Sequence, residues 1–373
     1  MPRVIVKNAS YAYESLRPSI FEILDSTGGK RIDGSSRVVI KPNLLAPAPP
    51  EQAVLTHPLV VRAVVEYVLE RGAKPQISDS PAVGSIERVL KTSGIKNALA
   101  GLDVEYKEFK SSVTIDAGEP FNRLEIAEDA LDADVLINLP KLKTHSQMLL
   151  TLGVKNLFGC VVGLRKPEWH LRVGVDRERF AALLVHIYEA LRPSLTILDG
   201  ILAMEGQGPG KGGVPKQLGV LMGSDDALAL DITVCGMLGM DADRLLTNKV
   251  AVEKGLLTGR IEVVGDVPRV KDFALPETKA VLFGPQRFHG FMRRHLIQRP
   301  VSNDDLCKAC GECWRYCPAG AITHDRKRIA FDYDKCIRCY CCIEVCPHGA
   351  LRSEDPLLGR IMKELRRLKN DKY

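Results

Sequence analysis

The stretch "CKACGECWRYCPAGAI" (residues 307–322) is repeated as "CIRCYCCIEVCPHGAL" (residues 336–351). Four cysteines and a proline recur at the same spacing in the two copies: Cys307, Cys310, Cys313, Cys317 and Pro318, then Cys336, Cys339, Cys342, Cys346 and Pro347. Nine of the 11 cysteines of the chain lie in the 40 residues from 307 to 346. Such tight clustering, without an export signal, indicates metal ligands rather than disulfides.

The repeated spacing predicts two [4Fe–4S] clusters, because Cys-x2-Cys-x2-Cys-x3-Cys-Pro is the bacterial ferredoxin run. Three close cysteines hold three corners of one cubane, and the fourth reaches across to the other cubane. We therefore expect cluster 1 on Cys307, Cys310, Cys313 and Cys346, and cluster 2 on Cys317, Cys336, Cys339 and Cys342. Zinc takes four thiolates per ion and leaves the third cysteine and the Cys-Pro step unexplained.

Residues 301–353 resemble the bacterial two-cluster ferredoxins, and the resemblance implies single-electron transfer at low potential. Cys341 lies outside the repeat, where the first copy has Glu312. We expect Cys341 to be a bystander in the cluster-binding loop, although it could tune or replace a ligand. Residues 354–373 read as a basic amphipathic helix that packs over the clusters or the main domain, with a partner-binding or membrane-surface helix as the alternative.

The composition indicates a soluble protein with room for two domains. Of 373 residues, 45% are hydrophobic and 26% charged, and neither a secretory signal nor a transmembrane run is apparent, so we expect a cytoplasmic protein. From residue 286 onward there are 18 Lys+Arg against 11 Asp+Glu. This basic excess either offsets bound anionic clusters or forms a docking face for an acidic redox partner protein, and no nucleic-acid partner is expected.

Residues 1–285 alternate strand-like and helix-like patterns. Short apolar runs such as "RVIVKNA", "RVVIKPNLL" and "ADVLINLP" alternate with amphipathic stretches such as "HPLVVRAVVEYVLERGA". This pattern predicts an α/β domain with a largely parallel central sheet flanked by helices. We expect residues 286–300 to link it to a small α+β ferredoxin-like domain at 301–353.

Polar residues follow several of the predicted strands, where parallel sheets bind ligands. The candidate catalytic residues are Lys141, Lys143 and His145. The candidate binding residues are Lys41, Asn43, Asp79, Lys155, Asn156, Asp199 and Glu205. Such lysines and amides suit an anionic carboxylate or phosphate. His145 could be a general acid or base, or only a surface or capping residue.

Two further motifs have structural interpretations. His57 is expected to help start a helix before Pro58. The glycine-rich "GPGKGG" (residues 208–213) is followed by a strand-like run rather than a helix. We therefore interpret it as a loop and not as a dinucleotide-binding fingerprint.

Several segments together resemble the prokaryotic family known as domain of unknown function 362, over about residues 35–245. They are "IKPNLL", "SDSP", "NLPKLKTH", "GVKNLFG", "DGILAMEGQGP" and "ALALD". Members often carry a C-terminal two-cluster ferredoxin, so the resemblance implies an iron–sulfur protein. A distant likeness to the lactate racemase fold is conceivable, but no residue pattern here carries over its nickel chemistry.

These observations predict an iron–sulfur oxidoreductase or electron-transfer subunit. Two [4Fe–4S] clusters would pass single electrons to or from an anionic substrate or cofactor in the α/β domain, and the identity of any further small-molecule cofactor is open. One alternative is a non-catalytic ferredoxin-type carrier whose α/β domain docks a partner. Another is a non-redox isomerase or racemase.

Overall fold

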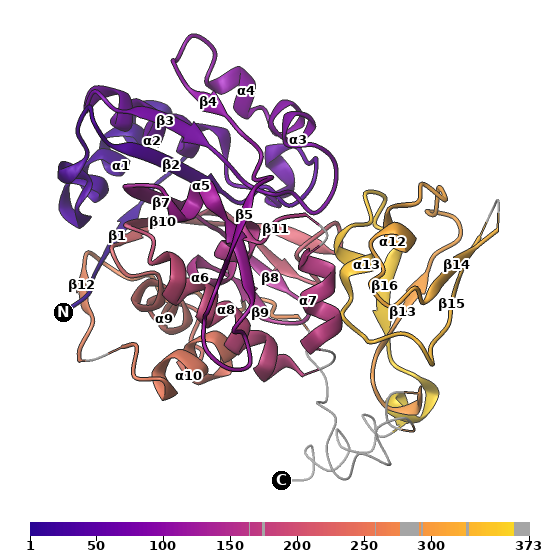
Figure 1. The fold of residues 1–373 in the computed structure, drawn as a ribbon. Coiled ribbons are helices and arrows are strands. Elements are labelled where there is room, and N and C mark those ends of the chain that lie inside the picture. The colour runs from indigo at the N-terminus through magenta and orange to yellow at the C-terminus, as the bar shows by residue number, and fades with distance from the viewer. Residues whose placement is uncertain are drawn as a thin grey trace.

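A computed structural model describes residues 1–163, 165–173, 176–257, 259–276, 291, 294–325 and 328–361. Figure 1 shows a large α/β body with a smaller C-terminal module, drawn in orange and yellow, against one side. The predicted fold class is thereby confirmed. Within the described ranges, no helix combines the length and apolar character needed to cross a membrane.

The body is built on a ten-stranded sheet with the order β12-β1-β11-β10-β7-β2-β3-β4, and β8 and β9 extend it beside β10. Its centre is parallel, since β7 pairs in parallel with β2 and β10, whereas β11 runs antiparallel to β1 and β10. The strands are β1 (Arg3–Asn8), β2 (Arg37–Pro42), β3 (Lys74–Ile77), β4 (Glu105–Tyr106), β7 (Val135–Leu139), β8 (Lys141–His145), β9 (Leu149–Thr151), β10 (Leu195–Gly206), β11 (Gly213–Ser224) and β12 (Glu262–Val264). A separate hairpin joins β5 (Ser112–Ile115) and β6 (Leu124–Ala127).

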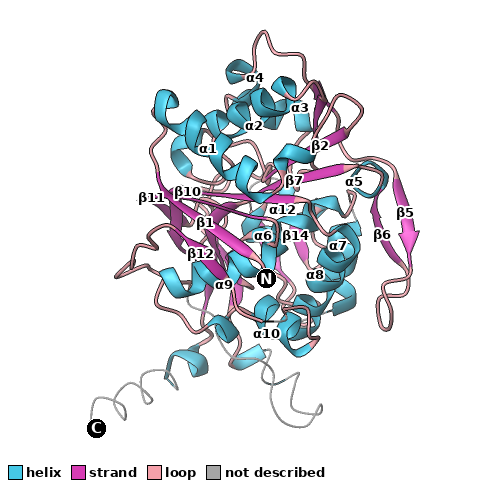
Figure 2. Cartoon of the chain, turned by 90° about the vertical axis from the view of Figure 1, so that its left-hand side faces the viewer, coloured by secondary structure: helices cyan, strands magenta, loops and turns pink. Residues whose placement is uncertain are grey.

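Helices cover both faces of the sheet (Figure 2). In β2, Val38 and Ile40 pack into one apolar cluster with α1 and α2, while Val39 between them packs into another with α8. This alternation follows from the two-residue period of a strand. The helices are α1 (Tyr13–Thr27), α2 (Pro58–Glu70), α3 (Ile86–Thr92), α4 (Ile95–Ala98), α5 (Glu128–Leu131), α6 (Gly153–Asn156), α7 (Arg165–Val173), α8 (Arg177–Leu191), α9 (Ala227–Met237) and α10 (Leu246–Glu253). Short 3-10 turns are η1 (Gly29–Arg31), η2 (Pro50–Gln52), η3 (Leu157–Cys160) and η4 (Ala242–Arg244).

Both structural interpretations of the sequence motifs are confirmed. His57 is the N-cap of α2, and its Nδ1 accepts the backbone N–H of Leu59 at 3.2 Å. Pro58 follows at the first helical position, where its missing N–H costs nothing. The glycine-rich segment 208–213 lies in the loop that connects β10 to β11, and its last residue, Gly213, begins β11.

Two strand boundaries differ from the prediction. Asp199 lies inside β10 rather than at its end, because β10 continues to Gly206 through pairing with β11. The segment Lys141–His145, expected to follow a strand, forms the separate strand β8, which pairs with β10 and β9. Residues 141–145 and Asp199 therefore lie within paired strands, and not beyond the strand ends as the sequence suggested.

The C-terminal module contains two small antiparallel pairs and two single-turn helices. β13 (Arg299–Ser302) pairs with β16 (Leu351–Glu354), and β14 (Ile322–His324) pairs with β15 (Ile329–Phe331). α12 (Glu312–Arg315) and α13 (Cys341–Glu344) occupy matching places in the two cysteine runs. The module thus begins at the end of the predicted linker, much of which (286–290, 292 and 293) lies outside the described residues.

The predicted C-terminal helix is described only at its start. Residues 357–361 are helical, and residues 362–373 lie outside the described part of the chain. Leu357, Leu358 and Ile361 are all exposed, Leu357 by 71%. The described start of the tail therefore does not bury the apolar face expected to pack on the protein.

Candidate functional site

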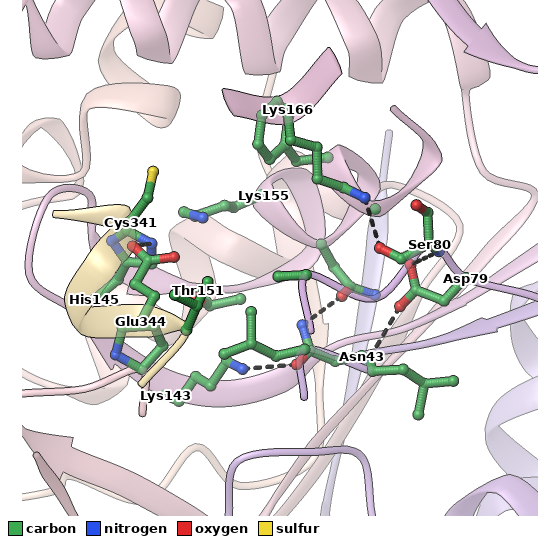
Figure 3. A pocket seen from close by; sticks show the side chains of 18 of the residues that line it. Asn43, Asp79, Ser80, Lys143, His145, Thr151, Lys155, Lys166, Cys341 and Glu344 are labelled. Atoms are coloured by element: carbon green, nitrogen blue, oxygen red, sulfur yellow. Dashed lines mark hydrogen bonds and ion pairs between the residues drawn. The ribbon is translucent and has the colours of Figure 1, made fainter. Parts of the chain in front are cut away.

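A pocket lies at the carboxyl ends of β2, β3 and β8, where the C-terminal module covers the edge of the α/β body (Figure 3). The empty space between its walls, open mouth and adjoining solvent included, is about 710 Å3. The body contributes Lys41, Asn43, Leu44, Leu45, Asp79, Ser80, Ala82, Lys143, His145, Thr151, Lys155, Asn156, Phe158, Gly159, Lys166, Pro167, His170 and Pro209. The module contributes Tyr316, Cys341, Glu344 and Val345.

A buried ion pair joins two strand ends at one end of the pocket. Lys41 in β2 places Nζ 3.1 Å from Oδ1 of Asp79, which follows β3, and both side chains are almost fully buried. The Asp79 carboxylate also accepts the backbone N–H groups of Leu44 at 2.9 Å and Ser80 at 2.8 Å. Because the buried carboxylate has both a counter-ion and hydrogen bonds, it forms a fixed part of the wall.

A chain of amides crosses the floor of the pocket. Lys143 donates from Nζ to Oδ1 of Asn43 and to the carbonyl of Val54, both at 2.7 Å. Asn43 in turn donates to Asn156 at 2.7 Å, and Asn156 donates to Asn138 at 2.8 Å. These bonds hold the ends of β2, β7 and β8 against α6, so the lysine and amides are positioned before any ligand arrives.

Burial lowers the pKa values of three lysines in the wall. Burial and the adjacent charge of Lys155 lower the pKa of Lys143 to about 7, and burial lowers that of Lys166 to about 8 although Asp79 is near. Burial also lowers the pKa of Lys155, whose Nζ makes no hydrogen bond or ion pair with any residue that the structure describes. A bound anion would favour the charged forms, so the wall is suited to anions.

The module places a carboxylate against the body. Oε1 of Glu344 in α13 lies 2.9 Å from Nε2 of His145. Nδ1 of His145 accepts the N–H groups of Gln147 and Met148, both at 3.2 Å, and burial lowers the pKa of His145 to about 4. Burial alone would raise the pKa of Glu344, but His145 and Lys155 lower it to about 2. Nδ1 of His145 is therefore occupied by backbone donors and Nε2 faces the Glu344 carboxylate, while a role of His145 as a general acid or base stays a prediction.

Three buried polar atoms in the pocket make no hydrogen bond with a described residue. They are Oγ1 of Thr151 in β9, Nδ1 of His170 in α7 and Oε1 of Glu344, which has only the ion-pair contact with His145. Thr151 and His170 are only 3% and 5% exposed. Buried polar groups are normally hydrogen-bonded, so all three atoms are candidate ligand contacts.

Three of the sequence candidates lie outside the pocket. Lys141 donates to Asp199 at 2.7 Å and to the hydroxyl of Tyr11 at 3.0 Å, and Asp199 also accepts the backbone N–H of His57 at 2.9 Å. The pocket does not include this closed buried network. Glu205 lies on the β10–β11 hairpin and pairs with a lysine at position 216.

The cysteines gather into two groups. Cys307, Cys310, Cys313 and Cys346 line one cavity. Burial and the charges of Cys339 and Cys336 raise the pKa of Cys317, and burial and the charges of Cys339, Cys336, Cys317 and, least of these, Cys313 raise that of Cys342. These groups coincide with the two predicted ligand sets, which stay predictions, and four thiolates around a cavity are the donors that a cubane requires. No three His, Cys, Asp or Glu side chains among the described residues converge closely enough for a single metal ion, but thiolates on separate irons need not converge.

The cluster 2 cysteines are neighbours of the pocket wall. Cys342 shares the short helix α13 with Cys341 and Glu344, both of which line the pocket. Tyr316, which also lines it, directly precedes Cys317. In the other group Cys310 is exposed. One cysteine group therefore reaches solvent at Cys310, and the other adjoins the pocket.

Sequence reasoning missed several pocket residues. Lys166 and His170 lie four residues apart on the buried side of α7, where only their helical spacing could have singled them out. Tyr316 and Glu344 reach the pocket only because the module docks, which no local pattern predicts. Cys341, expected to be a bystander, lies in the wall beside Glu344.

The comparisons with known proteins identify the family. The family model described as "Domain of unknown function (DUF362)" matches residues 38–236. A 4Fe-4S dicluster domain model matches residues 299–347. The chain belongs to the DUF362 family. The dicluster match also supports iron–sulfur cluster binding by the C-terminal module of this DUF362 protein.

This DUF362 protein is also similar to two individual proteins. It is 41% identical over 254 residues to the thylakoid-associated protein sll1697 of Synechocystis sp., covering 68% of this chain and 79% of that protein. It is 12% identical to the lactate racemase apoprotein from Thermoanaerobacterium thermosaccharolyticum, with a TM-score of 0.36 over 52% of this chain and 49% of the racemase chain. The second likeness carries no conclusion about activity, and the predicted cytoplasmic location stays a prediction.

Proposed function

We propose that this DUF362 protein transfers single electrons between a redox partner protein and an anionic ligand held in the pocket. Two [4Fe–4S] clusters, held by the two predicted cysteine sets, would each supply a one-electron redox centre. The residues of the chain then have three tasks: to hold the clusters, to bind the anion and to keep the two adjacent.

The proposal rests on one observation: the helix α13 contributes residues both to the predicted cluster 2 site and to the pocket. Cys342 in α13 is a predicted ligand of cluster 2, while Cys341 and Glu344 in the same turn line the pocket. A ligand in the pocket would thus lie next to a redox centre within one chain, where the effective concentration is higher than for a separate carrier. The exposed group around Cys310 offers the partner protein access to the other cluster.

The proposal is tested by the reoxidation of reduced clusters. Anaerobic holoprotein is reduced, freed of reductant and mixed with the low-mass anion fraction of the producing cells, while cluster absorbance is followed. We expect faster reoxidation with this fraction, and a loss of most of the acceleration in Lys155→Gln. Lys155 makes no hydrogen bond or ion pair with a described residue, so its replacement removes charge without breaking such a contact.

Lys96→Gln is the matched control, because Lys96 pairs with Glu87 on the exposed surface. It should reoxidise like the unmodified protein. If no fraction accelerates reoxidation, the pocket does not exchange electrons with a ligand, and the carrier with a partner-docking α/β domain becomes the better account.

Anion binding in the pocket is expected to weaken as pH rises. Lys143 and Lys166 are charged below pKa values of about 7 and about 8 and neutral above them, so the attraction for an anion is lost across this interval. Calorimetric titration from about pH 6 to about pH 9 with sulfate, whose own charge does not change over this range, measures it. Lys143→Gln should remove the loss of binding near pH 7. Binding that does not change with pH would contradict the pKa values assigned to Lys143 and Lys166. The charged or titratable neighbours are Lys155, Glu344, Lys141 and Asp79 for Lys143, and Asp79, Lys41, Cys160 and Glu108 for Lys166.

A further inference from the structure

The charges of the pocket are arranged at two ends. At one end Lys41 and Lys166 surround Asp79, which is 3.1 Å from Lys41 and whose charge acts on Lys166. At the other end the charge of Glu344 opposes the lowering of the pKa values of Lys143 and Lys155 by burial, and Asp79 adds a smaller effect of the same sign on Lys143. Figure 3 shows Asp79 and Lys166 on one side of the pocket and Lys155 and Glu344 on the other. Each end therefore has two lysines for one carboxylate.

The middle of the pocket is neutral. Asn43 lies between the two ends in Figure 3, and its amide is engaged by Lys143 and Asn156. Leu44, Leu45, Phe158 and Pro167 supply apolar wall. A carbon skeleton can pack there, and Lys143, which reaches the middle at Asn43, already donates to Asn43 and to the Val54 carbonyl.

Among the described residues, an unpartnered lysine and a buried hydroxyl mark the Glu344 end as a place for an acid group, bound beside the Glu344 carboxylate. Lys155 is half-buried and has no hydrogen-bond or ion-pair partner among the described residues. The hydroxyl of Thr151, which can donate, and Nδ1 of His170, which donates in one tautomer, are buried in the same pocket without a hydrogen-bond partner among the described residues, as is the acceptor Oε1 of Glu344. At the opposite end, Lys166 donates to the carbonyl of Ser80 at 2.6 Å, which leaves two of its three ammonium hydrogens for a ligand.

From this arrangement we infer that the ligand carries two acid groups on a short skeleton, one bound at the Lys41–Lys166 end and one at the Lys143–Lys155 end. The inference rests on the proposed ligand site and names the ligand class, a dicarboxylate or a carboxylate with a phosphate or phosphonate. A ligand with a single acid group would leave one end with an uncompensated lysine.

The inference is tested by titrating the oxidised holoprotein calorimetrically with malonate, succinate, glutarate and phosphonoacetate, and with the half-amide of each dicarboxylate. A half-amide keeps the skeleton and one acid group but loses the second charge. We expect the dicarboxylate of best-fitting length to bind at least about tenfold tighter than its half-amide. Lys155→Gln and Lys166→Gln should each abolish this advantage, and Lys96→Gln should preserve it.

Lys166→Gln keeps a donor for the Ser80 carbonyl, so loss of charge is separated from loss of the hydrogen bond. The inference would be overturned if a dicarboxylate and its half-amide bind equally well, or if the advantage of the dicarboxylate survives both substitutions. It would also be overturned if no probe binds at millimolar concentration. No electron donor is present in this titration. Diacid binding without reoxidation would refute only the electron-transfer proposal, and reoxidation without a diacid preference would refute only this inference.

Discussion

Replacing both Cys310 and Cys346 by alanine is expected to leave half of the bound iron in place. The two cysteines line the same cavity, although 36 residues separate them in the chain, so the double substitution removes ligands of one cluster only. The unmodified holoprotein should contain about eight irons per chain and the variant about four. Iron is counted after anaerobic purification, together with acid-labile sulfide.

The contrasting variant combines Cys310→Ala with Cys317→Ala. Cys317 belongs to the same sequence run as Cys310, but burial and the charges of Cys339 and Cys336 in the other run raise its pKa. If the fourth cysteine of each run crosses to the other cluster, this variant loses ligands of both clusters and nearly all of its iron. The reverse result, with half of the iron kept here and none in the first variant, would show that each run holds its own cluster.

Cys341→Ala is the matched control for both variants. Cys341 adjoins the predicted ligand Cys342 but falls outside both cysteine groups, and it lines the pocket instead. We expect the full iron content in Cys341→Ala. A loss of about four irons would make Cys341 a ligand and would revise the composition of cluster 2.

Gly159→Ala is expected to destabilise the protein by about 3 kcal/mol. A Cβ at residue 159 would overlap Oδ1 of Asp79 and lie 2.5 Å from Nζ of Lys41. The added methyl group must push apart a buried ion pair, which leaves both charges poorly compensated. Urea denaturation of the holoprotein gives the change in the free energy of unfolding.

Gly236→Ala provides the comparison. Gly236 lies in α9, and no atom lies within 4 Å of a Cβ built there. Alanine in a helix is favoured over glycine by up to about 1 kcal/mol, so this variant should be as stable as the unmodified protein or more so. Equal stability of both alanine variants would mean that the Lys41–Asp79 pair is not packed against residue 159.

The regular parts of the fold could be predicted from the sequence because each is a local pattern. The cysteine spacing predicted the C-terminal module, and the apolar runs predicted the parallel strands. Lys41, Asp79 and Asn156 reach one pocket because parallel strands end at one sheet edge, as the fold class implies.

The rest depends on tertiary contacts that no local pattern contains. Lys141 and Asp199 were expected beside the other polar residues, but their shared hydrogen bonds with Tyr11 satisfy them in a closed network of their own. Glu344 follows the second cysteine run and resembles any exposed carboxylate in sequence. Only the docking of the module brings it to within 2.9 Å of His145.

The central claim, that a bound anion and one cluster interact across α13, is tested most directly by an EPR-monitored redox titration. The holoprotein is titrated with and without a saturating amount of the diacid that calorimetry shows to bind. A negative ligand beside cluster 2 favours its oxidised form, so the account predicts a lower midpoint potential for one cluster and an unchanged potential for the other. If reduction weakens diacid binding tenfold, the shift is about 59 mV. Two unchanged potentials in the presence of a bound diacid would contradict the claim.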